Sequence, residues 1–248
     1  MEQEYKSWSL DRWVKFFDEI YGERNRGMMN EEIWLHVVEE VAELTEDLRK
    51  THIKPRYNKK GELEGVLVNF ADIFAWLCAF VTRHGSLEEI VWHKFPNICP
   101  YCFADKDCLC IARMSYMDKE EREKYLETHR KNKNNFPQKL DDWKKMFDRI
   151  YGNINRVQSI EQIGFHMTEE VGEVAREIRL RRKEELKEEI ADVFAWLIAI
   201  ILKCEAITNE EFNLADLLWQ RFPNKCHRCG SKPCKEKIYR TGPRANIS

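Results

Sequence analysis

Acidic residues at helical spacing are the part of this sequence best suited to chemistry. Glu170 and Glu173 are three residues apart, and Glu189 and Asp192 repeat that spacing further along the chain. On helices, each pair would lie on one face, one turn apart. Both pairs are surrounded by apolar residues, so the four carboxylates would repel one another and lose hydration. A hard divalent cation such as Mg²⁺ or Mn²⁺ would offset this cost, because it prefers oxygen ligands.

These acids belong to a unit that is written twice. The segment LDRWVKFFDEIYG at 10–22 returns as LDDWKKMFDRIYG at 140–152, with nine of thirteen positions identical. Further positions match in the same order. These are His36 with His166, Glu39-Glu40 with Glu169-Glu170, Glu43 with Glu173, residues 72–77 with 192–197, and the Cys-x-x-Cys pair at 99–102 with the pair at 226–229. Such self-similarity indicates an internal duplication in which each copy is one structural unit.

The hydrophobic pattern predicts an all-α fold, since apolar residues recur at three- and four-residue spacing in both copies. We expect helices near 10–21, 30–50, 66–84 and 86–95 in the first copy and near 140–151, 159–182, 185–204 and 208–221 in the second. The predicted organisation is repeat one with its Cys cluster over 1–110, a charged linker over 111–137, repeat two with its Cys cluster over 138–235, and a flexible tail over 236–248.

Composition narrows the function classes. The 248-residue chain has 41 basic and 43 acidic residues, which gives a net charge of −2. This balance argues against a protein that binds nucleic acid or a membrane surface through bulk charge. The longest apolar run, 193–202, is too short to span a bilayer, and the first residues lack a signal-peptide pattern. We therefore expect a cytoplasmic protein.

Seven of the nine cysteines lie in two short clusters, which in a reducing compartment point to metal more than to disulfides. Four thiolates within twelve residues can enclose a tetrahedral Zn²⁺, whereas the second cluster would need His227, solvent or another residue to complete it. Reduced free thiols and an iron–sulfur cluster are the alternatives. Cys78 and Cys204 are expected in the core. The predicted metal-binding cysteines are Cys99, Cys102, Cys108 and Cys110, and then Cys226, Cys229 and Cys234.

The pattern E-E-x-x-E at 169–173, followed by E-x-x-D at 189–192, resembles the signature of the MazG-type all-α NTP pyrophosphatases. The resemblance covers the second and third helices of both copies and is strongest in repeat two. It implies hydrolysis of a (deoxy)nucleoside triphosphate to the monophosphate and pyrophosphate. It also implies Mg²⁺ or Mn²⁺ held by Glu170, Glu173, Glu189 and Asp192. Glu169, on the flank of the same helix, could accept a proton from the attacking water or could orient the metal ligands without binding the metal itself.

Repeat one departs from that signature. It has Glu40, Glu43 and Asp72 as candidate metal ligands, but Asn69 stands at the position that matches Glu189. An amide oxygen can ligate a metal but brings no charge, so we expect a degenerate site with a structural or nucleotide-sensing role. Single-unit members of the family look like obligate homodimers, and two fused units could form the same contact as an intrachain pseudo-dimer. Further homo-oligomerisation stays open.

Three side chains near the acids are candidate substrate contacts. His166 and Trp196 lie one turn from Glu170 and Asp192, where the indole could stack on a base or simply belong to the core. Lys187 could bind phosphate. A non-catalytic nucleotide-sensing or adaptor protein using the same sites is the alternative function. A di-iron carboxylate bundle is disfavoured, because it usually needs a Glu-x-x-His motif that is absent here.

Overall fold

The computed structural model describes residues 3–49, 56–57, 63–108, 110 and 118–236. In chain order the elements are the short helix η1 (Glu4–Ser7), α1 (Leu10–Asn25), α2 (Asn30–Arg49), β1 (Arg56–Tyr57), β2 (Leu63–Glu64), α3 (Val66–Val81), α4 (Leu87–Lys94), α5 (Lys119–Lys131), η2 (Lys133–Asn135), α6 (Leu140–Val157), α7 (Ile160–Leu180), α8 (Lys183–Thr208) and α9 (Leu214–Arg221). The fold is all-α, as predicted, apart from the two-residue strands β1 and β2, which pair antiparallel in the connector between α2 and α3.

Helix starts follow the predictions closely except at the last helix, but α1 and α6 run four and six residues past their predicted ends at 21 and 151, and α8 runs four residues past 204. The sequence pattern predicted one helix over 208–221, whereas α8 continues to Thr208 and α9 begins only at Leu214. Asn209 ends α8 in a left-handed conformation (φ 56°), and Asn213 caps α9 by accepting from the backbone N–H of Asp216. Asparagine favours both of these roles, the left-handed helix end and the helix N-cap, and each role interrupts a continuous helix.

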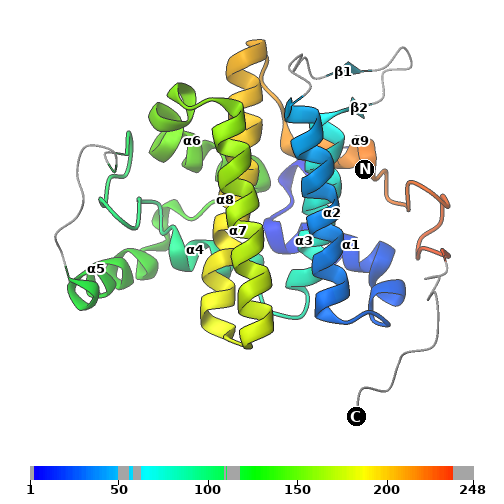
Figure 1. Cartoon of the computed structure of the whole chain (residues 1–248), viewed down its shortest axis with the longest axis horizontal. Coiled ribbons are helices and arrows are strands. Elements are labelled where there is room, and N and C mark those ends of the chain that lie inside the picture. Colours follow the sequence, from blue (N-terminus) through cyan, green and yellow to red (C-terminus); the bar gives the residue numbers. More distant parts are fainter. Residues whose placement is uncertain (1–2, 50–55, 58–62, 109, 111–117, 237–248) are drawn as a thin grey trace.

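Four long helices form the centre of the molecule. The α2–α3 and α7–α8 hairpins stand side by side, and α2 packs against α7 (Figure 1). The indole N–H of Trp34 on α2 donates to the backbone oxygen of Val171 on α7 over 3.1 Å, in a buried contact between the repeats. Phe74 and Phe194, which occupy matching positions of α3 and α8, are fully buried 6.3 Å apart. The two repeats therefore share one continuous core.

The shorter helices pack across the boundary between the two predicted repeats. The fourth helix of repeat one, α4, packs on α8 of repeat two, and α9 of repeat two packs on α3 of repeat one. The Cys clusters that follow them pack across this boundary in the same way. The backbone N–H of Cys108 donates to Ile150 O on α6, and that of Cys234 donates to Ile20 O on α1, each over 2.7 Å. Contacts therefore cross the predicted boundary between the repeats in both directions.

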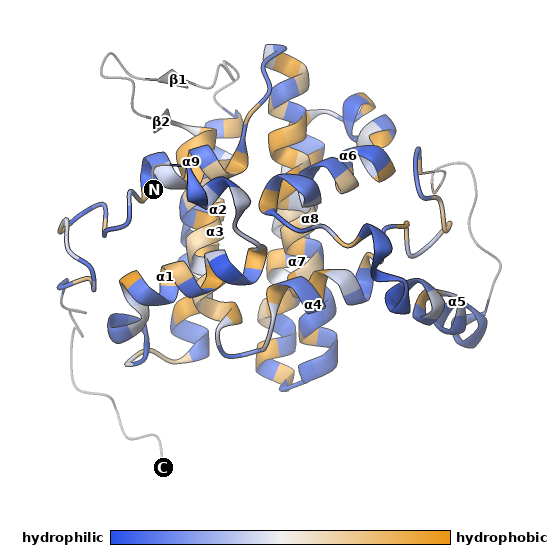
Figure 2. Cartoon of the chain, turned by 180° about the vertical axis from the view of Figure 1, so that it is seen from behind, coloured by the Kyte–Doolittle hydropathy of each residue, from blue (hydrophilic) through white to orange (hydrophobic). Residues whose placement is uncertain are grey.

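The predicted linker contains a well-defined helix. In Figure 2, α5 is hydrophilic along most of its length, yet its Leu126 is buried. The indole N–H of Trp92 on α4 donates to the carbonyl oxygen of Arg130 at the end of α5 over 2.9 Å. Part of the linker (111–117) and nearly all of the predicted tail (237–248) lie outside the described residues, so the domain limits stay predictions. Among the helices described, none combines the length and apolarity that crossing a membrane requires.

Candidate active site

The α7–α8 hairpin places the acids of repeat two. A capping box starts α7: the Ser159 hydroxyl accepts from the backbone N–H of Gln162, and the Gln162 side chain accepts from the backbone N–H of Ser159. Arg181 ends the helix in a left-handed conformation (φ 57°), so the chain turns directly into α8. The two helices then pack against each other along their length, which sets the acidic motif of one beside that of the other.

Three of the four predicted metal ligands come together. One carboxylate oxygen from each of Glu170, Glu173 and Glu189 lies within 4.8 Å of the other two, and all three side chains are half-buried. Oxygens that share one divalent cation at about 2.0–2.6 Å can be at most ~5 Å apart. The separation and the donor chemistry of these residues therefore fit a Mg²⁺-type ion.

The fourth predicted ligand, Asp192, is paired with a lysine from the other repeat. Lys94, the last residue of α4, donates from Nζ to Asp192 Oδ2 and to the carbonyl oxygen of Glu188 (3.4 Å). The Lys94 and Asp192 side chains are only 11% and 15% exposed. Asp192 also interacts with Glu170 and Glu189 through its charge. It belongs to the same acidic cluster, and Lys94 supplies part of the positive charge that the cluster needs.

Crowding and burial alter the acidity of this cluster. Burial raises the pKa of Asp192 and that of Glu189, each to about 7. The neighbouring carboxylate of Glu173 raises the pKa of Glu189 further, while Lys94 lowers both values. Carboxylic acids that share a partly dry site lose their protons readily only when a cation accompanies them. The cluster is therefore poised to exchange protons for a metal ion near neutral pH.

The aromatic candidates form one assembly with the first acidic motif. Trp196 stacks on His166 with ring centroids 4.5 Å apart, and its indole N–H donates to Glu170 Oε1 over 3.3 Å. His166 Nδ1 lies 3.1 Å from Glu169 Oε2, and Glu169 is 69% exposed. Trp196 is thus a positioning residue for Glu170, and Glu169 faces solvent beside the cluster.

Two further basic side chains on α7 and α8 differ in whether they reach the acids. Arg176 is 3.1 Å from Glu173 Oε1 and 3.6 Å from Glu189 Oε1. Lys187, which the sequence predicted as a phosphate contact, pairs instead with Glu184 over 3.1 Å on the rim of a neighbouring cavity. Among the described residues, Arg176 and Lys94 are therefore the cations that reach the acidic cluster itself.

The matching side chains of repeat one are arranged differently. Arg221 at the end of α9 donates to both carboxylate oxygens of Asp72, over 2.9 and 2.7 Å. Asn69 donates to Asp47 Oδ2 over 2.9 Å, so its amide is already engaged. Burial and the charge of Asp72 raise the pKa of Glu40 to about 7. Within the described part of the chain, Glu40, Glu43 and Asp72 do not make a close three-acid cluster of the kind found in repeat two.

Sequence reasoning missed the side chains that cross between the repeats. Lys94 and Arg221 each precede a Phe-Pro-Asn motif, and this shared basic residue was the available signal. Tyr101, between the first two cysteines of cluster one, was missed too. Burial raises the pKa of its hydroxyl, Lys94 lowers it, and the charges of Asp192 and Glu170 raise it further, so Tyr101 lies within the electrostatic reach of the acids.

Both Cys clusters consist of free thiols, and Cys78 and Cys204 lie in the core as predicted. In cluster one, the Sγ atoms of Cys99, Cys102, Cys108 and Cys110 are all within 4.8 Å of one another, with contacts of 3.4–3.5 Å. Cluster two brings together Cys226, Cys229 and Cys234. Neither ring nitrogen of His227 lies among the three thiols of cluster two, and its Nδ1 lies 3.4 Å from the Tyr21 hydroxyl.

Comparison with known proteins agrees with the site in repeat two. Residues 158–228 match the family model described as the MazG nucleotide pyrophosphohydrolase domain. No curated protein and no solved structure matches the chain. A MazG domain indicates nucleotide pyrophosphohydrolase activity in general. Residues 158–228, which carry Glu170, Glu173, Glu189 and Asp192, therefore form a MazG nucleotide pyrophosphohydrolase domain.

Proposed function

We propose that repeat two hydrolyses (deoxy)nucleoside triphosphates to the monophosphate and pyrophosphate, with Mg²⁺ or Mn²⁺ as the metal. The observation that carries the proposal is the convergence of Glu170, Glu173 and Glu189 to within 4.8 Å of one another, on two helices of a MazG domain. With Asp192 beside them, these residues would hold the metal. When bound, the ion would neutralise phosphate charge and make a water molecule more acidic.

The protein's own side chains have separate roles in this proposal. Trp196 holds Glu170 in place through its N–H, and stacking on His166 fixes the indole. Glu169 lies one residue before Glu170 and is exposed, so it can accept a proton from the attacking water and pass it to solvent. Asp192 would join the metal ligands, and Lys94, which pairs with Asp192 in this structure, would then be free to bind the phosphate chain. Arg176 is placed to bind phosphate at the opposite end of the cluster.

Repeat one has a structural or nucleotide-sensing role in this proposal. Its supporting observation is the bidentate Arg221–Asp72 pair together with the neutral Asn69. An arginine cannot lose its charge, and a bidentate pair is strong, so Asp72 is less available to a metal than Asp192 is. A fully non-catalytic sensor is the alternative function for the whole chain.

We also propose a structural Zn²⁺ in Cys cluster one. Zinc bound tetrahedrally by thiolates at about 2.3 Å holds sulfur atoms roughly 3.8 Å apart, close to the spacing of these four thiols. Contacts with Cys108 and with backbone N–H groups lower the pKa of the Cys99 thiol, while contact with Cys99 raises the pKa of Cys108 and burial raises that of Cys110, so a bound cation would be needed for all of these thiols to ionise together. Cluster two offers three thiols and would bind more weakly. Reduced thiols match a cytoplasmic location, which is part of the proposal. Homo-oligomerisation of the chain is a further part of it.

The deciding experiment measures pyrophosphate release from a panel of standard and modified (d)NTPs with Mg²⁺. We expect Asp192→Ala to lower the rate at least ~100-fold, since metal coordination contributes several kcal/mol to the transition state. The matched variant Asp72→Ala should keep the rate within about threefold of wild type, because it changes only the degenerate site. Activity that survives Asp192→Ala but not Asp72→Ala would show that repeat one, not repeat two, is the catalytic repeat. Nucleotide binding without any turnover would favour the sensor.

A further inference from the structure

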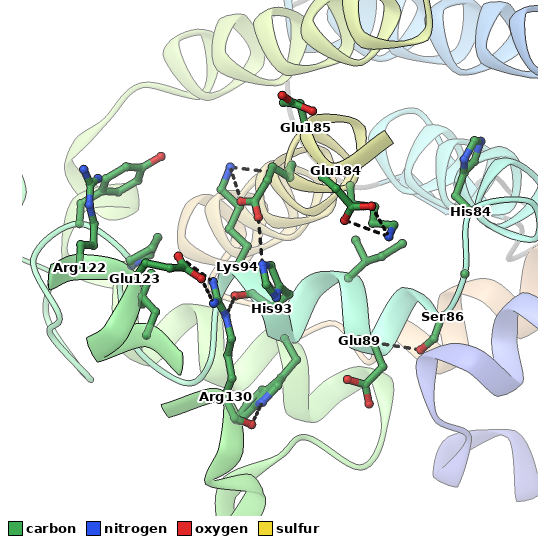
Figure 3. A pocket seen from close by; sticks show the side chains of 18 residues that line it. His84, Ser86, Glu89, His93, Lys94, Arg122, Glu123, Arg130, Glu184 and Glu185 are labelled. Carbon is green, nitrogen blue, oxygen red and sulfur yellow. Dashed lines mark hydrogen bonds and ion pairs between the residues drawn. The ribbon is translucent and has the colours of Figure 1, made fainter. Parts of the chain in front are cut away.

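A large cavity opens beside the acidic cluster of repeat two. Its volume is about 750 Å³, and its walls come from α4, α5, the start of α8 and the Cys loop of repeat one (Figure 3). Pockets of roughly 300–1,000 Å³ bury ligands of nucleoside size or larger. A pyrophosphate leaving group needs much less room than this. The cavity is therefore larger than hydrolysis of a simple triphosphate requires on its leaving-group side.

The cavity and the aromatic pair lie on opposite sides of the acids. Lys94 both lines the cavity and donates to Asp192, so the two sites meet at this side chain. Along α8, the cavity residues end at Glu188, whereas Trp196 follows the acids eight positions later, a rise of about 12 Å. A phosphate chain bound at the acids would thus have the His166–Trp196 pair at one end and the cavity at the other.

The interior of the cavity suits an uncharged, partly apolar group. Ile90, Trp92 and Leu126 line it with little exposed surface, whereas Tyr101, which also lines it, is 52% exposed and offers its ring to a base. The charged side chains around it are largely paired with one another: Lys187 with Glu184, Arg130 with Glu123, and His93 with Glu188. Paired charges offer hydrogen bonds to a sugar or a base edge, but they give little net attraction for further phosphate.

The acids are therefore flanked on both sides by places for neutral, aromatic-containing groups, with the cations Lys94 and Arg176 between them. From this geometry we infer that the substrate is a two-ended nucleotide, in which a second nucleoside-like group is attached at the far end of the phosphate chain. A dinucleoside polyphosphate is the simplest example. One nucleoside would lie at His166–Trp196, the phosphates over the acids, and the second nucleoside in the cavity. This inference rests on the proposed hydrolysis and names its substrate class.

The reaction balances as an ordinary hydrolysis. A water oxygen forms a bond to the phosphorus nearest the first nucleoside, and the bond from that phosphorus to its bridging oxygen breaks. The bridging oxygen leaves with the second group as its phosphate ester, and the water proton passes through Glu169 to solvent. Helix α5 supplies one wall of the cavity through Arg122, Leu126 and Arg130, on the side where Lys94 reaches the repeat-two acids.

Filling the cavity tests the inference. Arg122 on α5 is half-buried and lines the cavity, whereas Thr128 on the same helix is exposed and does not line it. We would compare Arg122→Trp with the matched control Thr128→Trp, and use His93→Trp on α4 as a second filling variant. The substrates are diadenosine tetraphosphate and ATP, both with Mg²⁺. We expect wild type to cleave diadenosine tetraphosphate, and both filling variants to lower its kcat/KM at least ~10-fold while changing that of ATP less than about twofold.

The outcomes separate this inference from the proposed function. Release of pyrophosphate from triphosphates with no cleavage of diadenosine tetraphosphate would overturn the inference and leave the function intact. Equal losses for both substrates would show that the cavity binds the base of a simple triphosphate, which also overturns it. If nothing is hydrolysed, displacement of a fluorescent ATP analogue decides: diadenosine tetraphosphate must compete better than ATP with wild type, and lose that advantage with Arg122→Trp.

Discussion

Replacing Lys94 by methionine tests whether repeat one completes the site of repeat two. The change keeps the length and packing of the side chain but removes its charge from Asp192. Lys94 lowers the pKa values of Asp192, Glu189 and Glu170 together, so its loss leaves the cluster with less compensation. Both members of the Lys94–Asp192 pair are at most 15% exposed, so water can screen the remaining charge only partly.

The size and the pH dependence of the effect follow from that burial. Asp192 has a folded-state pKa of about 7 against an ordinary value of 3.8. An acid whose pKa is higher in the folded state than in the unfolded state stabilises the fold at low pH. This stabilisation is lost as the pH rises through the folded-state pKa. At pH 5 Asp192 is protonated, and we expect Lys94→Met to cost at most ~1 kcal/mol. At pH 8 the wild-type carboxylate is ionised, whereas the variant must bury it unpaired or keep it protonated; one pH unit above a pKa of about 7 this adds at most about 1.4 kcal/mol, so the cost should rise to about 2 kcal/mol.

The assay is urea unfolding at pH 5 and pH 8, with and without Mg²⁺, beside the exposed control Lys124→Met. Mg²⁺ at about 100 times its Kd adds roughly 2.7 kcal/mol to a protein that binds it only when folded. Because the ion replaces the missing charge, the deficit of Lys94→Met at pH 8 should shrink when Mg²⁺ is present. The variant should also bind Mg²⁺ more tightly than wild type, yet hydrolyse more slowly. Equal destabilisation at both pH values, unchanged by Mg²⁺, would show that Lys94 only packs α4 against α8.

Three further predictions address the metal sites. Trp196→Phe keeps the aromatic ring on His166 but removes the N–H that lowers the pKa of Glu170. The affinity for Mg²⁺ at pH 7 should therefore fall about tenfold and recover at pH 8. A change in KM alone would contradict this positioning role. Mg²⁺ affinity of the wild-type protein should rise ~10- to 100-fold from pH 6 to pH 8, with proton release visible by calorimetry in two buffers, since two ligands have pKa values of about 7; a flat profile would place the metal elsewhere. Cys99→Ser should remove one equivalent of zinc and lower Tm by about 5 °C, whereas Cys229→Ser should leave cluster one loaded; identical zinc contents would refute the site.

Much of the fold and half of the site could be predicted from the sequence, because they depend on local periodicity. Three- and four-residue apolar spacing specified the helices of both repeats. The acids of repeat two converge because Glu170 and Glu173 share one face of α7, and the short turn at Arg181 returns the chain beside them. The family match over 158–228 agrees with the resemblance seen in those motifs.

The packing across the boundary between the repeats was decided only by the tertiary structure. Lys94 and Asp192 are 98 positions apart. In a duplicated chain, α4 could cover α3 of its own repeat or the equivalent face of α8, because matching helices carry matching apolar faces. Both pairings bury similar surfaces, so local pattern cannot distinguish them. The position of α5 was also decided by the tertiary structure. Because α5 is charged along most of its length, its sequence predicts a solvated helix. Only the packing of Leu126 and the bond from Trp92 reveal that it forms a wall beside the acids.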